Sequence, residues 1–492
     1  MNSYLNKQSV LQIYQVINQM KNCIVSTIGI LTTLSFCLFL NSCSTKRESK
    51  KQAEEKPNIV IVLADDASRA YFGSSNSGFY TKTPNIDKLA TEGMQLTQFY
   101  TATSMCAPCR HELYTGMMPS RSGMHQNHSK PKADFENIKT LLSPLGYNVG
   151  LAGKLHFLTK NPLDKIEGFA GGQRDPQENW TFNYVKEYMQ HSMKENKPFC
   201  FILGSALPHS PWASGKPEEI DPAKVTVPPH MIDTKATREM IVAHMAEIVL
   251  LDKQVGQTDS LLKALNIDQE TIFIFLSEQG SSLPLAKLSG NNFGFHSECL
   301  IRWPGKIKPG TKNPAIGQYV DVLPTLVEIA GGKAPESMDG KSMLDVWLNK
   351  KTSHREYAYT SFHTDYRRAI NNDEFRLIKT VPGKYAREFH VDPMFQPYWP
   401  EWLEVAKTDP EAKEKVERIS RDFRTYEFYN IKNDPFERFD LADDPKYAEV
   451  LEKMKEDFEK EYSRLNDDFD DYISREASKK MEQETKEKKK NT

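Results

Sequence analysis

The sequence has few cysteines, almost no net charge and no apolar run long enough for an ordinary membrane span. Seven cysteines occur in 492 residues, and three of them (Cys23, Cys37 and Cys43) precede the globular part. The remaining four are too few for a disulfide scaffold. The formal net charge of −2 excludes the broad basic field expected of a nucleic-acid-binding protein. The length allows one large domain and a smaller one.

The longest apolar run lies near the N-terminus. Residues 24–40 are nearly all apolar or hydroxyl-bearing and come after Lys21. Such a run is short for a spanning helix and typical of a signal-peptide core, with an uncleaved anchor as the alternative. It ends in Leu-Asn-Ser-Cys at 40–43, which resembles a bacterial lipobox and implies lipidation of Cys43.

These features predict a bacterial membrane-anchored lipoprotein. The lipoprotein signal peptide would cover 1–42, and the polar stretch 43–56 would be a tether. Because the tether lacks an acidic run, we expect an outer-membrane protein facing the periplasm, with display on the cell surface as the alternative.

Four short apolar runs each lead directly into chemically active residues. The four pairings are 58–64 before Asp65 and Asp66, 147–152 before Lys154 and His156, 198–204 before His209, and 271–276 before Glu278 and Gln279. Continuous apolar runs are typical of strands buried on both faces of a parallel sheet, and residues 237–264 between two of them look helical. The sequence therefore predicts an α/β fold with a largely parallel central sheet covered by helices, and active residues at the carboxyl ends of its strands.

A second, smaller region comes after the predicted catalytic domain of 57–350. Residues 375–379 and 426–430 look like strands, and a charged helix is expected from 445 to about 475. We therefore expect an α+β subdomain over 351–475. The run of Lys, Glu and Gln at 476–492 is typical of a solvated tail.

Residues 106–110 read Cys-Ala-Pro-Cys-Arg, and Thr115 and Gly116 come shortly after them. Proline suits the first turn of a helix, so a helix is expected to begin here. Its N-terminus would favour an anion at Cys106. A C-x-x-C redox or zinc motif formed by Cys106 and Cys109 is the alternative, but the sequence has no second cysteine pair of this kind.

Together these strings resemble the type I, formylglycine-dependent sulfatases of the alkaline-phosphatase-like superfamily, whose signature is C-x-P-x-R and then T-G. The resemblance covers most of 57–475. The spacing from Gln279 and Gly280 through Pro284 to Lys287 is similar to that of sulfamidase-like enzymes and of bacterial polysaccharide sulfatases such as those acting on ulvan. It implies that a formylglycine-generating maturation enzyme oxidises Cys106 to formylglycine, whose hydrate is the nucleophile.

The resemblance also implies a role for each candidate site residue. The implied ligands of one Ca²⁺ ion are Asp65, Asp66, Cys106, Glu278 and Gln279. Oxygen ligands favour calcium over zinc, although Glu278 and Gln279 are each one methylene longer than the usual family pair. The implied catalytic groups are Lys154, His209 and Lys287 on the sulfate, Arg110 on the hydrate, and His156 for proton transfer. A sugar rim is expected at His363, Arg367 and Arg368.

We therefore expect a sulfatase that hydrolyses sulfate esters of a sulfated polysaccharide or its oligosaccharides. The alternatives are a glucosamine N-sulfamidase acting on heparan-type glycans, a phosphatase of the same superfamily, and an inactive glycan-binding homologue. Helix capping is the alternative role for Asp65 and Asp66. The sequence leaves open which sugar is recognised and whether the sulfate is an ester or a sulfamate.

Overall fold

The structure is a computed structural model that describes residues 15–16, 56–79, 81–127, 129–157, 164–165, 182–362, 367–380, 397–420, 424–465 and 467. The chain divides into two compact units, Met1–Glu55 and Lys56–Thr492. Both sheets and the candidate site belong to the second unit. Among the described residues, no helix has the length and apolar character needed to cross a bilayer.

A large mixed sheet forms the centre of this unit. Within the described residues its strands are β1 (Asn58–Leu63), β2 (Met94–Tyr100), β3 (Asn148–Gly153), β4 (Asp164–Lys165), β5 (Phe199–Gly204), β6 (Thr271–Leu276), β7 (His296–Ser297), β8 (Cys299–Arg302) and β9 (Thr311–Gln318). Their spatial order is β4-β3-β5-β1-β6-β8-β2-β7, and β9 pairs with β2.

The four strands expected from the apolar runs are β1, β3, β5 and β6, and the structure confirms all four. They lie next to one another and are parallel, with β1 between β5 and β6. Antiparallel pairing begins only at β8, which joins β6 to β2. The carboxyl ends of the four parallel strands therefore share one edge of the sheet.

Both faces of the sheet are buried, which explains why β1, β5 and β6 are apolar beyond their first residues. Alternate side chains of a strand point to opposite faces. Val60 and Val62 of β1 pack in one apolar cluster, and Ile59 and Ile61 pack in the other.

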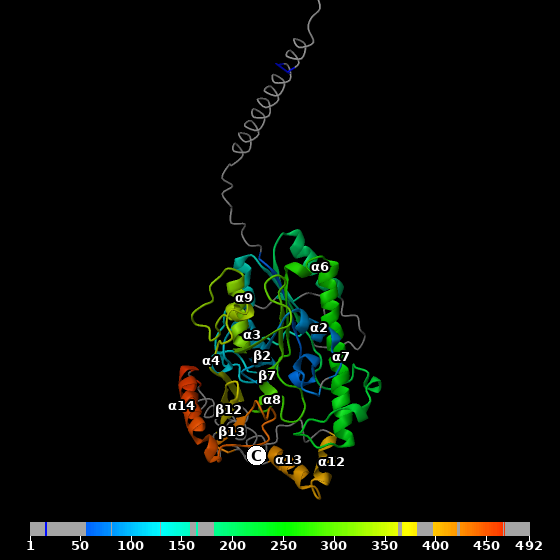
Figure 1. Ribbon diagram of the computed structural model, residues 1–492, viewed down its shortest axis with the longest axis vertical. Coiled ribbons are helices and arrows are strands. Elements are labelled where there is room, and N and C mark those ends of the chain that lie inside the picture. Colours follow the sequence, from blue (N-terminus) through cyan, green and yellow to red (C-terminus); the bar gives the residue numbers. More distant parts are fainter. Residues whose placement is uncertain are drawn as a thin grey trace, which may run out of the picture. The chain divides into compact units, whose positions relative to one another are not determined.

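Helices cover each face (Figure 1). Those of the described residues are α2 (Pro84–Glu92), α3 (Cys106–Thr115), α4 (Pro119–Ser122), α5 (Ile138–Leu142), α6 (Phe182–Lys194), α7 (Lys235–Ala264), α8 (Asn292–Phe295), α9 (Val322–Ile329), α10 (Leu344–Trp347), α12 (Tyr398–Val405), α13 (Pro410–Ser420) and α14 (Ala448–Leu465). Helices α2 and α7 contribute to the cluster around Val60, whereas α3, α5 and α9 contribute to the cluster around Ile59.

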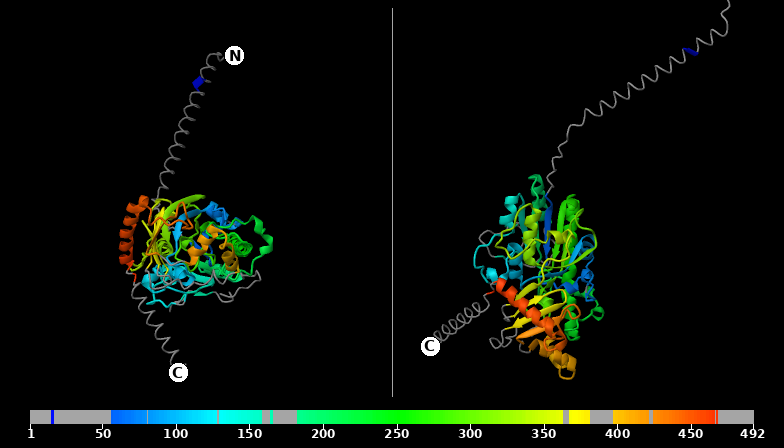
Figure 2. Two further views of the ribbon diagram at one scale, coloured as in Figure 1. Left: turned by 90° about the horizontal axis from the view of Figure 1, so that it is seen from below. Right: turned by 60° about the vertical axis from the view of Figure 1, so that its left-hand side comes forward.

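A second, antiparallel sheet lies beyond the central one. Its strands are β10 (Ala358–Phe362), β11 (Arg367–Asn371), β12 (Phe375–Thr380) and β13 (Tyr426–Asn430), in that spatial order. Leu377 and Phe428 of this sheet pack against Leu451, Met454 and Phe458 of α14, which crosses it (Figure 2). The predicted strands at 375–379 and 426–430 are confirmed, and the helix expected from 445 begins at Ala448. The α/β fold with a small C-terminal antiparallel sheet is thus confirmed.

Candidate active site

Two pairs of polar residues lie just beyond the neighbouring strands β1 and β6. Asp65 and Asp66 come after β1, and Glu278 comes two residues after β6. The two strands pair in parallel along their full length, so these residues arrive side by side. The backbone N–H of Asp66 donates to Glu278 Oε2 at 3.2 Å. Asp66 and Glu278 both have positive φ, +61° and +62°, and such strained backbone is common at functional sites.

The helix α3 begins at Cys106, as the motif predicts. Its N-terminal end is capped from another loop, where Asn127 Oδ1 accepts the N–H of Ala107 at 3.1 Å. Pro108 lies in the first turn, where a missing N–H leaves no acceptor unsatisfied. Gly116 ends the helix with φ of +66° and donates its N–H to Glu112 O, which explains the glycine of the motif.

Cys106 lies at the centre of the polar cluster. Its Sγ atom is 3.7 Å from Asp66 Oδ1 and 3.7 Å from Gln279 Nε2. The side chain is 1% exposed. Burial and the nearby carboxylates raise the pKa of the Cys106 thiol well above its ordinary value. Cys109 is a free thiol like Cys106, so the structure shows no C-x-x-C disulfide.

Arg110 lies in the first turns of α3. Its side chain contacts the segments that follow three of the strands. Its Nε atom pairs with Glu278 Oε1 at 2.7 Å, and its Nη1 donates to Lys154 O at 2.7 Å. Its Nη2 donates to Ala64 O at 3.4 Å and lies 3.7 Å from Asp65 Oδ1. This fully buried guanidinium therefore fixes the loops after β1, β3 and β6 relative to one another.

Two lysines contact the aspartates, Lys154 at Asp65 and Lys287 at Asp66. Lys154 Nζ lies 2.7 Å from both carboxylate oxygens of Asp65. Lys287 Nζ lies 2.5 Å from Asp66 Oδ2 and 3.1 Å from His209 Nε2. The structure thus brings together the predicted catalytic cations and the predicted ligands.

The remaining predicted proton-transfer group, His156, lies two residues beyond Lys154 on the segment after β3. It is half-buried, and its φ is +45°. Its assignment to proton transfer stays a prediction.

Opposite charges nearby offset the effect of burial on Asp65 and on Lys287. Burial alone would raise the pKa of Asp65, but Lys154 and Arg110 hold it below its ordinary value. Burial would lower the pKa of Lys287, but Asp66 raises it above its ordinary value. Asp65 is therefore ionised and Lys287 charged across the neutral pH range.

The donor set fits a hard divalent cation. Ligand atoms of Asp65, Asp66, Cys106 and Glu278 lie within 4.8 Å of one another. Gln279 Oε1 is buried, and among the described residues no donor reaches it, while its Nε2 faces Asp66 Oδ1 at 2.5 Å. A buried amide oxygen without a donor, beside three carboxylates, is suited to an oxygen-binding cation such as Ca²⁺.

The arginines expected on a sugar rim lie inside the second sheet instead. Arg367 pairs with Glu427 at 2.5 Å, and Arg368 pairs with Asp467 at 2.8 Å. Each arginine is 2% exposed. Both guanidinium groups are therefore buried and paired with carboxylates of the protein, and their substrate-binding role stays a prediction. His363, also expected on the rim, and Cys43 lie outside the described residues.

Two contacts of the cluster were not predicted from the sequence. Ser282 Oγ donates to Asp66 Oδ2 at 3.4 Å, and the hydroxyl of Tyr319 lies 2.6 Å from the backbone N of Glu278. Ser282 falls within the spacing from Gln279 to Lys287, so a signal for it was present in the motif. Tyr319 lies far along the chain in an apolar stretch, so no local pattern marks it.

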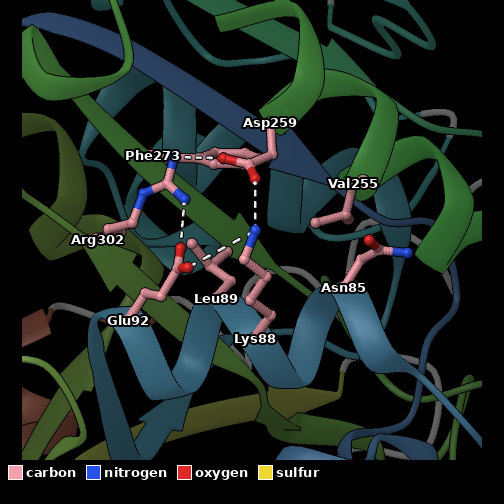
Figure 3. A pocket seen from close by; sticks show the side chains of 9 residues that line it. Asn85, Lys88, Leu89, Glu92, Val255, Asp259, Phe273 and Arg302 are labelled. Carbon is pink, nitrogen blue, oxygen red and sulfur yellow. Dashed lines mark hydrogen bonds and ion pairs between the residues drawn. The ribbon is translucent and has the colours of Figure 1, made fainter. Parts of the chain in front are cut away.

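A small pocket lies apart from this cluster, between α2, α7 and the strands β6 and β8. Its charged side chains pair with one another, as Figure 3 shows. Lys88 lies 3.2 Å from Asp259, and Arg302 lies 2.8 Å from Glu92 and 2.6 Å from Asp259. Because these charges are matched within the protein, we interpret the pocket as a structural ion-pair network.

The sequence of this chain is similar to those of known sulfatases. Residues 57–332 match the family model described as Sulfatase, and residues 291–391 match that described as N-sulphoglucosamine sulphohydrolase, C-terminal. An ulvan-active sulfatase of Formosa agariphila is 30% identical over 426 residues, covering 83% of this chain and 80% of that protein. The human N-sulphoglucosamine sulphohydrolase is 24% identical over 476 residues, covering 82% of this chain and 89% of that protein.

A solved structure described as a complex with its substrate D-glucosamine-2-N,6-O-disulfate has the same fold. Its TM-score is 0.62 at 17% identity, over 84% of this chain and 99% of that one. The family match covers more than half of the chain and contains the whole cluster from Asp65 to Lys287. The chain therefore belongs to the sulfatase family and is a sulfuric ester hydrolase.

Proposed function

We propose that this sulfatase hydrolyses sulfate esters of a sulfated polysaccharide, or of oligosaccharides derived from it, with algal ulvan as the first candidate. The observation that carries the proposal is the placement of Cys106 at the start of α3, against carboxylates that also hold Lys154 and Lys287. The identity of 30% with an ulvan-active sulfatase supports the substrate class.

In this proposal Cys106 is oxidised to formylglycine by a maturation enzyme, and the aldehyde hydrate supplies the attacking oxygen. Lys154, His209 and Lys287 bind the sulfuryl oxygens, whose negative charge otherwise repels a nucleophile. Their cationic groups stabilise the charge that builds in the transition state. His156 is assigned the proton transfer beside Cys106.

A glucosamine N-sulfamidase is the second candidate. The match of residues 291–391 to the C-terminal region of N-sulphoglucosamine sulphohydrolase favours it. The same cations would bind an N-sulfate group, so the two candidates differ only in the leaving group and the sugar around it.

A screen of defined substrates separates these candidates. Sulfate release would be measured from ulvan oligosaccharides, from O-sulfated and N-sulfated glucosamines, and phosphate release from matched phosphate monoesters. Release from ulvan oligosaccharides alone supports the first proposal, and release from N-sulfated glucosamine alone supports the second. Faster hydrolysis of the phosphate monoesters than of every sulfate would contradict both.

We also propose that the cluster binds one Ca²⁺ ion through Asp65, Asp66, Glu278 and Gln279, beside residue 106. The ion would supply positive charge at the sulfate and at the nucleophile. Asp66→Asn keeps the shape of the side chain but removes its charge, so calcium affinity is expected to fall about 100-fold or more. Titration calorimetry on metal-free protein, which needs no turnover, would measure both stoichiometry and affinity.

Asp259→Asn is the matched control for this experiment, because Asp259 belongs to the ion-pair network of Figure 3 and not to the cluster. Its calcium affinity should equal that of the unmodified protein. Stoichiometric zinc in the purified protein, with no measurable calcium binding, would contradict the assignment and favour a phosphatase-like site.

We further propose that Cys43 carries the lipid anchor of an outer-membrane lipoprotein, with the catalytic unit facing the periplasm. The support is the lipobox-like sequence at 40–43. Cys43→Ala should move the protein from the membrane fraction to the soluble fraction, which immunoblotting of fractionated cells would measure. Unchanged retention would refute the lipobox assignment, and protease treatment of whole cells would distinguish a periplasmic from a surface location.

A further inference from the structure

The loop that carries Lys287 has a conformation that its own sequence does not favour. It connects β6 to α8, and Leu285 and Leu288 in it have positive φ, +60° and +56°. Left-handed backbone is unfavourable for residues with a branched side chain. Such a conformation persists only where the surroundings impose it, so the contacts of this loop decide where Lys287 lies.

One set of contacts comes from the segment before Cys106. The backbone N–H of Leu288 donates to Ser104 O at 3.1 Å, and Ser104 Oγ donates to Ser289 O at 2.7 Å. These bonds tie the loop to the helix start that presents Cys106.

The other set comes from the second sheet and from the segment after β13. Arg376 of β12 donates from Nη2 to Gly290 O at 3.1 Å, and Asn291 Nδ2 donates to Glu437 Oε2 at 2.8 Å. Arg376 Nε and Glu437 Oε1 pair with each other at 3.0 Å. Both ionic side chains are almost completely buried, at 0% and 1% exposed.

Gly290 packs closely against Arg367 of β11 at this junction. A Cβ atom added to Gly290 would lie 2.7 Å from Arg367 Cδ, closer than real contacts of this kind. Arg367 also donates from Nη1 to Asn291 Oδ1 at 3.3 Å. The second sheet therefore holds the loop only three and four residues beyond Lys287.

We propose that Arg376 and Glu437 are positioning residues of the sulfatase site. Their ion pair joins β12 to the segment after β13, fixes residues 290–291 and thereby holds the Lys287 ammonium group beside Asp66 and His209. The inference rests on the proposed role of Lys287 in binding the sulfuryl group. It assigns the second sheet a part in catalysis that does not require it to touch the substrate.

Arg376→Lys tests the proposal against a closely matched control. Lysine keeps the charge, but it lacks the planar guanidinium fork, in which Nε pairs with Glu437 while Nη2 donates to Gly290 O. The control is Arg302→Lys in the network of Figure 3. Arg302 is likewise buried and paired with carboxylates, and it lies over the Phe273 ring at 5.4 Å, as Arg376 lies over the Phe295 ring at 5.1 Å.

The first measurement is hydrogen exchange of the loop amides, which does not depend on any substrate. The amide of Lys287, bonded to Ser281 O, and that of Leu288, bonded to Ser104 O, should exchange about tenfold faster or more in Arg376→Lys. They should exchange at the normal rate in Arg302→Lys. Equal exchange in the two variants overturns the inference, whatever the enzyme hydrolyses.

The second measurement is turnover of a substrate that the unmodified enzyme hydrolyses. We expect Arg376→Lys to lower kcat by about 10- to 100-fold with little change in KM, while Arg302→Lys leaves both unchanged. In a Lys287→Ala background, adding Arg376→Lys should cost little more, because the group it positions is gone. Fully additive losses would overturn the inference.

Asn291→Ala provides a second route if Arg376→Lys does not fold. It removes only the side-chain contact with Glu437 and should change loop exchange and kcat in the same direction. Wild-type exchange and kcat in a folded Asn291→Ala would overturn the inference. An unmodified enzyme that releases no sulfate from any substrate would refute the proposed function, whereas the exchange experiment would still decide this inference.

Discussion

Cys106→Ala is expected to abolish sulfate release while leaving the protein folded. The two polar contacts of its Sγ atom with described residues are long, at 3.7 Å each, so its loss should change the free energy of unfolding by about 1 kcal/mol. If residue 106 supplies the attacking oxygen after oxidation, alanine leaves nothing to react, and kcat should fall below detection. Sulfate release and denaturant unfolding would be measured on the same preparation.

Cys109→Ser is the matched control, because Cys109 is also a buried free thiol on α3, three residues further along. It should retain turnover within about fivefold of the unmodified enzyme. Mass spectrometry of the tryptic peptide should show an aldehyde at 106 in active protein. Full activity with only unmodified cysteine at 106, or turnover by Cys106→Ala, would refute the formylglycine mechanism.

Lys287→Ala should lower kcat by about 10²- to 10³-fold on every sulfated substrate that the enzyme accepts. Lys287 is largely enclosed by protein, with a side chain that is 8% exposed. Its charge acts at short range with little screening by water, and it matters most as negative charge builds during transfer. The loss should therefore appear in kcat more than in KM.

The assay should be run at saturating calcium. Removing the Lys287 charge beside Asp66 changes the electrostatic environment of the proposed metal site and hence its calcium affinity. Lys88→Ala is the control, since Lys88 is paired with Asp259 in the separate pocket (Figure 3). It should turn over substrate at the normal rate. If Lys287→Ala also behaves normally, another cation binds the sulfuryl group and the spacing from Gln279 to Lys287 has been misinterpreted.

The sequence predicted the four central strands because their burial on both faces leaves a direct mark, an unbroken apolar run. The family resemblance implied that the residues after β1 and β6 meet, and the parallel pairing of these strands brings them to one edge of the sheet. The sequence could not predict the strand order or the switch to antiparallel pairing at β8. Those features depend on contacts between distant segments, which no local pattern records.

The arginines of β11 show the same limit at the level of side chains. Arg367 and Arg368 are adjacent cations on a short strand, a pattern that also suits an anion-binding surface. Their partners, Glu427 and Asp467, lie 60 and 99 residues further along the chain, so their ion pairs are visible only in the folded protein. Local patterns thus pointed to the residues that gather around Cys106, but they did not reveal that Arg367 and Arg368 are paired within the protein.

The position of β1 between two parallel neighbours restricts how this protein can change in length. Each of its residues from Ile59 to Leu63 is in register with both β5 and β6. A single deletion or insertion in β1 would exchange the side chains that face the two apolar clusters and turn Asp65 and Asp66 away from Cys106. Length variation among descendants of this chain should therefore be excluded from the strand that precedes Asp65 and accumulate in surface loops that carry no reacting group.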